Sequence, residues 1–327
     1  GIDIMPEIDL PGHMLSALAS YPELGCTGGP YAVMAYGGIS QDVLCAGNEK
    51  TYKFIEDVLT EVMDVFPYEY VHIGGDECPK NRWEACHQCQ ARIKALGIKS
   101  DADHTAEQLL QRYVTKRIGK FLKEHGRRMV GWDEILEGEA PLDAVVMSWR
   151  GTEGGIKASG LGHDVIMTPN RNMYFDYCQG ENKESEPDGI GGYLPVWKVY
   201  EYEPFAPEMT DEQKSHILGV QANLWTEFIS TDSHLEYMLL PRLSALSEVQ
   251  WCLPGRKSFD RLMKDMPRMA SLYENLGYDY AKHVFGVIDQ HRSLEEGVEF
   301  PFHTAGEAGI RYTVDGSEPT AGSQLYE

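Results

Sequence analysis

Tyr70-Val71-His72-Ile73-Gly74-Gly75-Asp76-Glu77-Cys78 is an apolar run that leads directly into two glycines and two acids. The apolar residues are typical of a buried strand, and the glycine pair lets the backbone turn sharply where the strand ends. Neighbouring side chains that normally point to opposite faces can then reach one cavity. The stretch predicts that Asp76 and Glu77 are functional carboxylates; a solvated acidic turn is the alternative for an isolated Asp-Glu pair.

The same pattern, an apolar run followed by acids, proline, histidine or tryptophan, recurs along the chain. Together with the first stretch it gives six strand-like runs, at residues 2–13, 70–73, 129–134, 145–150, 165–169 and 219–227. Functional groups at the carboxyl ends of successive strands are the arrangement of a TIM (β/α)8 barrel. We therefore expect an α/β fold of this type.

The segments between these runs have the spacing of amphipathic helices. Apolar residues recur at helical intervals over residues 54–66 and 109–122, and each segment precedes a strand-like run. Alternating strands and helices indicate parallel strands covered by helices on their outer side. Two later helices, over 234–249 and 259–276, are expected to pack on the barrel.

Cleavage of a glycosidic bond is a reaction that needs this kind of acid chemistry. A carboxylic acid protonates the departing oxygen, and a nucleophile stabilises the developing oxocarbenium ion. We expect Glu77 to be the acid, with like-charge repulsion from Asp76 raising its proton affinity. Adjacent residues are poorly placed to flank one sugar from opposite sides, so Asp76 needs a role other than nucleophile.

Six motifs of the chain resemble glycoside hydrolase family 20, the β-N-acetylhexosaminidases. In chain order they are Pro6-Glu7-Ile8-Asp9-Leu10-Pro11-Gly12-His13, His72-Ile73-Gly74-Gly75-Asp76-Glu77, Gly131-Trp132-Asp133-Glu134, Ser148-Trp149-Arg150-Gly151, Tyr174-Phe175-Asp176 and Leu224-Trp225-Thr226-Glu227. They span about residues 1 to 280, and six matches in order are far more specific than one. The resemblance implies an exo-acting enzyme that removes terminal β-linked N-acetylglucosamine or N-acetylgalactosamine from a glycan.

The resemblance also implies a role for each candidate residue. In this family the substrate's own 2-acetamido carbonyl attacks the anomeric carbon and gives an oxazolinium intermediate. Asp76 would orient the acetamide, Glu77 would protonate the leaving group, and Tyr174 would donate a hydrogen bond to the acetamide oxygen. The implied substrate-binding residues are Trp132, Trp149 and Trp225 as apolar walls, Asp176 and Glu227 as partners of sugar hydroxyls, and His13 as a supporting residue.

The position of the motifs sets the expected domain organisation. In the family, the segment that matches residues 6–13 belongs to the third barrel strand. The resemblance therefore implies that the chain lacks the first two strands, an arginine that binds sugar on the first of them, and the domain before them. Residues 1–285 are expected to form the rest of the catalytic barrel. Residues 286–327 are expected to begin a small β-sandwich module, and Asp315-Gly316 is an independent hairpin-turn signal there.

Several charged residues of the motifs are expected to support the site rather than react. Glu7 and Asp9 share one face of their strand by alternation, so one or both are expected to line the barrel mouth and brace the site. Asp133 and Glu134 are assigned structural roles. Arg150 is expected to form an ion pair with a nearby acid.

Charge and hydropathy exclude some partners. The net charge of −22 argues against a nucleic-acid partner, because phosphate backbones need a basic surface. No apolar run is long enough to cross a bilayer. The expected partner is a glycan or oligosaccharide, the resemblance implies an exported protein, and the oligomeric state stays open.

The cysteines raise the question of a metal. Cys86-His87-Gln88-Cys89, with Cys78 upstream, has the start of a metal or redox motif. No second Cys-x-x-Cys and no distant histidine pair completes a tetrahedral set among the seven cysteines. We therefore expect a loop disulfide or free thiols, and no metal or cofactor.

Two other functions remain open. A non-catalytic sugar-binding barrel would keep the pocket and lose the acid pair, which the presence of Asp76 and Glu77 disfavours. A barrel glycosidase for sugars without an acetamido group would need an enzyme carboxylate as nucleophile, and Glu227 is the candidate.

Overall fold

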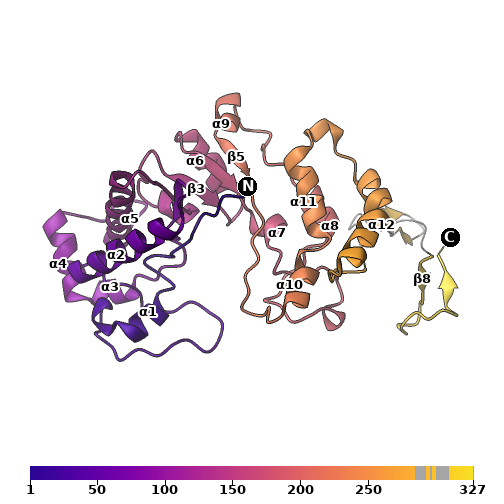
Figure 1. The fold of residues 1–327 in the computed structure, drawn as a ribbon, viewed down its shortest axis with the longest axis horizontal. Coiled ribbons are helices and arrows are strands. Elements are labelled where there is room, and N and C mark those ends of the chain that lie inside the picture. The colour runs from indigo at the N-terminus through magenta and orange to yellow at the C-terminus, as the bar shows by residue number, and fades with distance from the viewer. Residues whose placement is uncertain (284–291, 295–296, 300–308, 327) are drawn as a thin grey trace. The chain divides into compact units, whose positions relative to one another are not determined.

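The structure, a computed structural model, describes residues 1–283, 292–294, 297–299 and 309–326. The chain divides into two compact units (Figure 1). The first unit comprises Gly1–Pro169 and Pro204–Val220, and the second comprises Asn170–Glu203 and Gln221–Glu327.

A parallel sheet forms the centre of the first unit. Its five strands lie in chain order: β1 (Tyr70–His72), β2 (Arg128–Trp132), β3 (Val145–Ser148), β4 (Val165–Met167) and β5 (Ile217–Val220). Every residue of β3 is buried, as the near-continuous apolar run predicts for a strand covered on both faces. Because all five strands are parallel, their carboxyl ends meet at one edge, which is where the predicted site residues of this unit lie.

Helices cover the sheet, although β2 and β3 are joined through the 3₁₀ turn η2 and not through an α-helix as the predicted alternation requires. The helices and short 3₁₀ turns of this unit are α1 (Leu15–Ser20), η1 (Pro22–Leu24), α2 (Glu49–Val65), α3 (Asn81–Ala85), α4 (His87–Leu96), α5 (Ala106–Glu124), η2 (Asp133–Leu136), α6 (Glu153–Gly160) and α9 (Asp211–Ser215). α5 packs on β2, α6 on β3 and β4, and α9 on β5. α5 starts at a capping box formed by Thr105 and Gln108, which satisfies backbone N–H groups of the first turn. The α/β class and the parallel strand order are confirmed.

The first strand-like run, residues 2–13, does not form a regular strand. It lies parallel to β1 through a single bridge between Glu7 and His72. The backbone N–H groups of Ile8 and Leu10 donate to carbonyl oxygens of the β1 segment at 2.9 and 2.8 Å. Pro6 and Pro11 have no N–H group, so a continuous ladder cannot form on both sides of this segment. The prediction of a strand here was therefore wrong in detail, although the pairing partner and direction fit it.

The second unit is mainly helical. Its helices and 3₁₀ turns are α7 (Asn170–Met173), η3 (Lys183–Ser185), α8 (Val196–Tyr200), α10 (Asp232–Leu239), α11 (Arg242–Trp251), η4 (Pro254–Arg256) and α12 (Phe259–Leu276). α8 and α10 both pack against α11. The prediction of α12 over 259–276 is confirmed, with Ser258 capping its start and Gly277 in the left-handed conformation after its end. The single helix predicted over 234–249 is wrong: Leu240 is extended and Pro241 cannot continue the helical hydrogen bonds, so two helices form.

Short antiparallel strand pairs follow α12. β6 (Arg292–Leu294) pairs with β7 (Gly297–Glu299), and β8 (Arg311–Tyr312) pairs with β9 (Gln324–Leu325). Asp315, in the segment between β8 and β9, accepts a hydrogen bond from the Ser317 backbone at 3.0 Å. The predicted boundary at 285/286 lies outside the described residues, and the β-sandwich module stays a prediction. Over the described part of the chain, no helix combines the length and the hydropathy that a membrane span needs.

Candidate active site

Two residues of the candidate site have left-handed backbone conformations, one before β1 in the chain and one after it. His13 has φ 51° and Glu77 has φ 44°, values that are uncommon outside glycine. Gly74 and Gly75, with φ 67° and 103°, provide the sharp turn that was predicted from the glycine pair. Backbone strain of this kind clusters at functional sites, where surrounding structure holds it in place.

The glycines are needed because two loops approach each other closely. A Cβ atom on Gly74 would lie 1.7 Å from Oδ1 of Asp9, and one on Gly12 would lie 3.0 Å from the Asp76 carbonyl oxygen. The loop that carries Asp9 and His13 therefore packs backbone to backbone against the loop that carries the two predicted acids.

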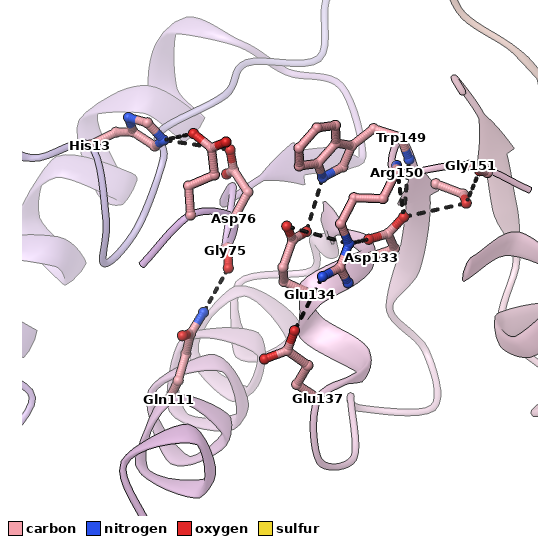
Figure 2. Close-up of polar contacts among 12 residues, drawn as sticks. His13, Gly75, Asp76, Gln111, Asp133, Glu134, Glu137, Trp149, Arg150 and Gly151 are labelled. Carbon is pink, nitrogen blue, oxygen red and sulfur yellow. Dashed lines mark hydrogen bonds and ion pairs between the residues drawn. The ribbon is translucent and has the colours of Figure 1, made fainter. Parts of the chain in front are cut away.

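His13 faces a group of carboxylates. Its Nε2 lies 3.3 Å from Oε2 of Glu77, 3.6 Å from Oδ2 of Asp76 and 4.0 Å from Oδ2 of Asp9. Figure 2 shows the imidazole of His13 directed at Asp76. The structure thus brings together three of the predicted residues, His13, Asp76 and Glu77, and the supporting role of His13 stays a prediction.

Asp9 is the carboxyl partner of Asp76, a relationship that the sequence did not reveal. Burial and the nearby charge of Asp76 raise the pKa of Asp9 to about 9, and burial raises the pKa of Asp76 as well. The raised pKa of Asp9 favours its protonated form at neutral pH, beside the carboxyl group of Asp76. Oδ1 of Asp9 also accepts the backbone N–H of Gly75 at 3.2 Å.

One carboxylate oxygen of Asp76 can accept a hydrogen bond that the described residues do not provide. Oδ1 is buried and has no hydrogen-bond donor among the residues that the structure describes. A buried acceptor without a donor costs free energy, on the order of 1–3 kcal/mol. Such an atom at the end of a strand, beside Glu77, is suited to receive an N–H group from a bound ligand.

Glu7 fixes Trp132. The indole Nε1 of Trp132 donates to Oε1 of Glu7 at 2.9 Å, and the ring meets His72 edge to face with centroids 4.7 Å apart. Against the effect of burial, the nearby imidazole of His72 and the hydrogen bond from Trp132 lower the pKa of Glu7, so it remains a carboxylate. Glu7 thus contacts Trp132 and Asp9 contacts the Gly75 backbone, as expected of residues that brace the site.

Asp133, Glu134 and Arg150 hold Trp149 (Figure 2). Asp133 is buried and accepts the backbone N–H of Trp149 at 3.1 Å and Nε of Arg150 at 2.5 Å. Nε1 of Trp149 donates to Glu134 at 3.0 Å, and burial raises the pKa of Glu134 to about 7. The predicted ion pair of Arg150 is confirmed, and the hydrogen bonds of Asp133 and Glu134 agree with the structural roles predicted for them.

Gln111 supports the acid loop from a helix. Its Nε2 donates to the carbonyl oxygen of Gly75 at 2.6 Å, as Figure 2 shows, and its Oε1 accepts Nζ of Lys80 at 2.5 Å. The sequence analysis missed this residue. The available signal was its place on the apolar stripe of α5, three and seven residues before the buried Val114 and Ile118.

The second unit carries the remaining candidates. Tyr174 forms a parallel bridge with Asn223, and its ring centroid lies 6.5 Å from that of Trp225. Burial and then the charge of Glu227 raise the pKa of Asp176 to about 6. Both carboxylate oxygens of Asp176 are buried without a donor in the described part of the chain, and Glu227 is exposed.

Arg242 organises the backbone around Asp176 and was not predicted. It is completely buried, and its guanidinium donates to four carbonyl oxygens, those of Phe175, Tyr177, Leu194 and Met238. The sequence of α11, which also carries Ser244, Ser247, Glu248 and Gln250, gave no local signal that its first residue is buried. Its hydrogen bonds fix the segment that carries Tyr174 and Asp176.

Comparisons with known proteins agree with the motifs. Residues 1–253 match a family model described as "Glycosyl hydrolase family 20, catalytic domain". The chain is 40% identical over 331 residues to a beta-hexosaminidase of Porphyromonas gingivalis, an alignment that covers 99% of this chain and 41% of that protein. It is 34% identical over 253 residues to a beta-hexosaminidase of Vibrio furnissii, covering 76% of this chain and 40% of the relative.

Solved structures give the same result. The chain is similar, with a TM-score of 0.75 and 31% identity, to a GH20 exo-beta-N-acetylglucosaminidase from Vibrio harveyi in complex with N-acetylglucosamine. That match covers 86% of this chain and 44% of the solved one. A beta-N-acetylhexosaminidase from Bacteroides fragilis is similar with a TM-score of 0.71 and 28% identity, covering 86% of this chain and 55% of that one. The chain thus spans roughly half or less of the length of these relatives.

Proposed function

This chain belongs to glycosyl hydrolase family 20, and from that premise we propose that the protein removes terminal, non-reducing β-linked N-acetylhexosamine from glycans. The observation that carries the proposal is the pairing of Asp76 and Glu77 at the end of β1. Oδ1 of Asp76 is a buried acceptor that finds no donor among the described residues, and Glu77 beside it is held by His13. An acetamido N–H is a donor of the kind that Asp76 can accept.

The proposed reaction has two steps. First, the acetamido carbonyl oxygen bonds to the anomeric carbon as the glycosidic bond breaks, and Glu77 passes its proton to the departing oxygen. Asp76 accepts the acetamido N–H, and its charge stabilises the oxazolinium ion. Second, water attacks the anomeric carbon and gives its proton to Glu77, the bond to the acetamido oxygen breaks, and the sugar leaves with its configuration retained.

The other candidates have proposed roles in binding. Tyr174 donates a hydrogen bond to the acetamido oxygen, which holds it in position for attack. Trp132, Trp149 and Trp225 provide apolar surfaces for the acetamido group and the sugar face. Asp176 and Glu227 accept hydrogen bonds from sugar hydroxyls, and the unpartnered oxygens of Asp176 support that role. His13 positions the acid pair.

A comparison of two substrates tests this function. The full-length protein should hydrolyse an aryl β-N-acetylglucosaminide orders of magnitude faster than the matching aryl β-glucoside, because only the first carries the nucleophile. Comparable rates would contradict substrate assistance and favour an enzyme carboxylate such as Glu227. Tight binding of N-acetylglucosamine without hydrolysis would favour the non-catalytic sugar-binding barrel.

Three finer proposals rest mainly on the resemblance. They are that two further barrel strands and a sugar-binding arginine belong to the same catalytic domain, that residues 286–327 begin a β-sandwich module, and that the protein is exported. Reading the complete gene tests the first two, and activity measured in separated cell fractions tests the third.

A further inference from the structure

Four cysteine side chains converge in the first unit. Cys26, Cys45, Cys86 and Cys89, the cysteine cluster, have sulfur atoms that all lie within 4.8 Å of one another. The Sγ atoms of Cys45 and Cys86, and of Cys45 and Cys89, are 3.7 Å apart, and those of Cys26 and Cys89 are 3.8 Å apart. Three of the four residues are buried.

These distances exclude disulfides and fit a metal ion. A disulfide bond is about 2.05 Å long, and all seven cysteines, each within the described residues, are free. In a tetrahedral zinc–thiolate site with Zn–S bonds of about 2.3 Å, neighbouring sulfurs are about 3.8 Å apart. The sulfur separations in the cluster are therefore close to the edges of such a tetrahedron, and the predicted loop disulfide is not formed.

The cluster is assembled from a helix start and two loops. Cys86 precedes the first residue of α4 and Cys89 lies in its first turn, which gives the Cys-x-x-Cys pair. Cys26 and Cys45 come singly from two loops that are joined by an antiparallel bridge between Gly25 and Leu44. This distribution explains why the sequence analysis expected no metal: the second ligand pair has no short spacing to recognise.

Gly47 brings the second loop against the helix start. A Cβ atom at this position would lie 2.2 Å from the carbonyl carbon of Gln88, inside the Cys-x-x-Cys turn. The backbone of residues 45–47 is thus in direct contact with the turn between Cys86 and Cys89. Such close contact is what four sulfurs need in order to surround one point.

We propose that Cys26, Cys45, Cys86 and Cys89 bind one zinc ion as thiolates. Four thiols release four protons as they replace the water ligands of Zn²⁺. Soft thiolate ligands in a tetrahedral set select zinc over magnesium or calcium, which prefer oxygen. Because all four positions are taken by protein, the ion is structural and has no site for a substrate.

The zinc ion would hold the two loops of the candidate active site together. Leu44, next to Cys45, donates its backbone N–H to the carbonyl oxygen of Pro11 at 3.1 Å, two residues before His13. The buried Trp83 donates its indole N–H to the carbonyl oxygen of Leu44 at 2.9 Å, from the segment that links Glu77 to Cys86. Loss of the metal should therefore loosen His13 and the acid loop at the same time.

Metal analysis of the full-length protein tests the proposal without reference to activity. Protein purified without chelators should contain about one zinc ion per chain, as measured by inductively coupled plasma mass spectrometry. Cys45→Ser and Cys89→Ser should each lose most of the zinc. Cys252→Ser, a change at a partly exposed cysteine outside the cluster, should keep it. Zinc content unchanged in both cluster variants would overturn the proposal.

The wild-type protein carries a second test that does not depend on folding of the variants. Treatment with a chelator and an alkylating reagent should release zinc. The amount released should match the extent to which the four cluster cysteines are alkylated, as measured by peptide mapping. Alkylation of Cys252 should occur without zinc release. Wild-type protein that lacks zinc, that contains iron in its place, or in which peptide mapping finds disulfides among the four cysteines would contradict the assignment. Because metal content is the readout, this test can fail while the hydrolase function stands.

Discussion

The imidazole Nε2 of His13 lies 3.3 Å from Oε2 of Glu77, and both residues have left-handed backbone conformations. They come from different segments, one running beside β1 and the other following it. The strained conformation of each directs its side chain toward the other. This contact links the predicted general acid to a neighbouring loop, and it can be broken without removing the acid itself.

His13→Gln should lower kcat/KM for aryl β-N-acetylglucosaminides by about 2- to 10-fold, the effect of losing a hydrogen bond worth about 0.5–1.5 kcal/mol. Thermal stability should change little, because His13 is partly exposed. His125→Gln, at an exposed histidine that follows α5, is the control and should leave activity unchanged. Wild-type activity in His13→Gln would show that the contact with Glu77 has no role in catalysis.

The two acids should differ in their dependence on the leaving group. Glu77→Gln should slow substrates with poor leaving groups by about 10²- to 10⁴-fold and activated aryl substrates much less, because only the former need protonation. Asp76→Asn should slow both kinds, because orientation of the acetamide is required whatever group departs. Rates measured on a series of aryl substrates with graded leaving-group pKa check this. The same slope in both variants would contradict the division of roles.

Asp9→Asn should change how stability depends on pH. The pKa of Asp9 is about 9 in the folded protein against 3.8 for an ordinary aspartate. A raised pKa means that the stability contributed by the protonated group is complete below about pH 4 and is lost as pH rises toward 9. Asparagine cannot ionise, so the melting temperature of the variant relative to wild type should rise over this range.

Asp164→Asn is the matched comparison for that experiment, with the opposite sign. Although burial opposes it, the hydrogen bond from Arg128 lowers the pKa of Asp164, so its contribution to stability is present at neutral pH and lost on acidification. The melting temperature of this variant relative to wild type should fall as pH rises from the acid range. Parallel pH profiles for the two variants would show that Asp9 is not held in its protonated form.

Gly74→Ala should damage both stability and activity. The new Cβ would lie 1.7 Å from Oδ1 of Asp9 at a position with φ 67°. Gly126→Ala is the control: Gly126 has a similar φ of 72°, and nothing lies within 4 Å of the new Cβ atom. The free energy of unfolding of this control should fall only by the cost of placing alanine in the left-handed region, about 1–2 kcal/mol.

The difference between the two glycine variants isolates the contact with Asp9. The free energy of unfolding of Gly74→Ala should fall by about 1–3 kcal/mol more than that of the control, which is the usual cost of overpacking. Its kcat should fall as well. Denaturant titration and steady-state kinetics of both proteins give these values. Equal losses in the two variants, with full activity retained, would refute a tight contact between Gly74 and Asp9.

Local patterns were enough to predict much of the fold. The apolar runs identified the strands β1 to β5, and the helical spacing identified the helices that cover them. Both patterns depend only on residues that are close in sequence. The errors came from prolines. Pro6 and Pro11 prevent a regular strand at the N-terminal segment. Pro241 divides residues 234–249, which the apolar spacing predicted as one helix, into two helices.

The site was predictable only where one segment contains the evidence. The glycine turn pointed to Asp76 and Glu77, whereas Asp9, Gln111 and the cysteine cluster depend on contacts between segments far apart in the chain. Cys45 and Cys86 are 41 residues apart, and no local pattern connects them. Tertiary structure alone brings such groups into reach of one another.

The hydrogen bond from Gln111 to the Gly75 carbonyl means that the acid loop cannot be treated as an exchangeable module. A glycosidase engineer who transplants residues 74–78 into a related barrel would carry over the turn but leave behind its supports. Gln111 comes from the middle of α5, and Gly12 and Asp9 come from the segment beside β1. A graft that includes these three positions has the anchoring contacts of the loop, and one without them has a turn that must find new contacts in its host.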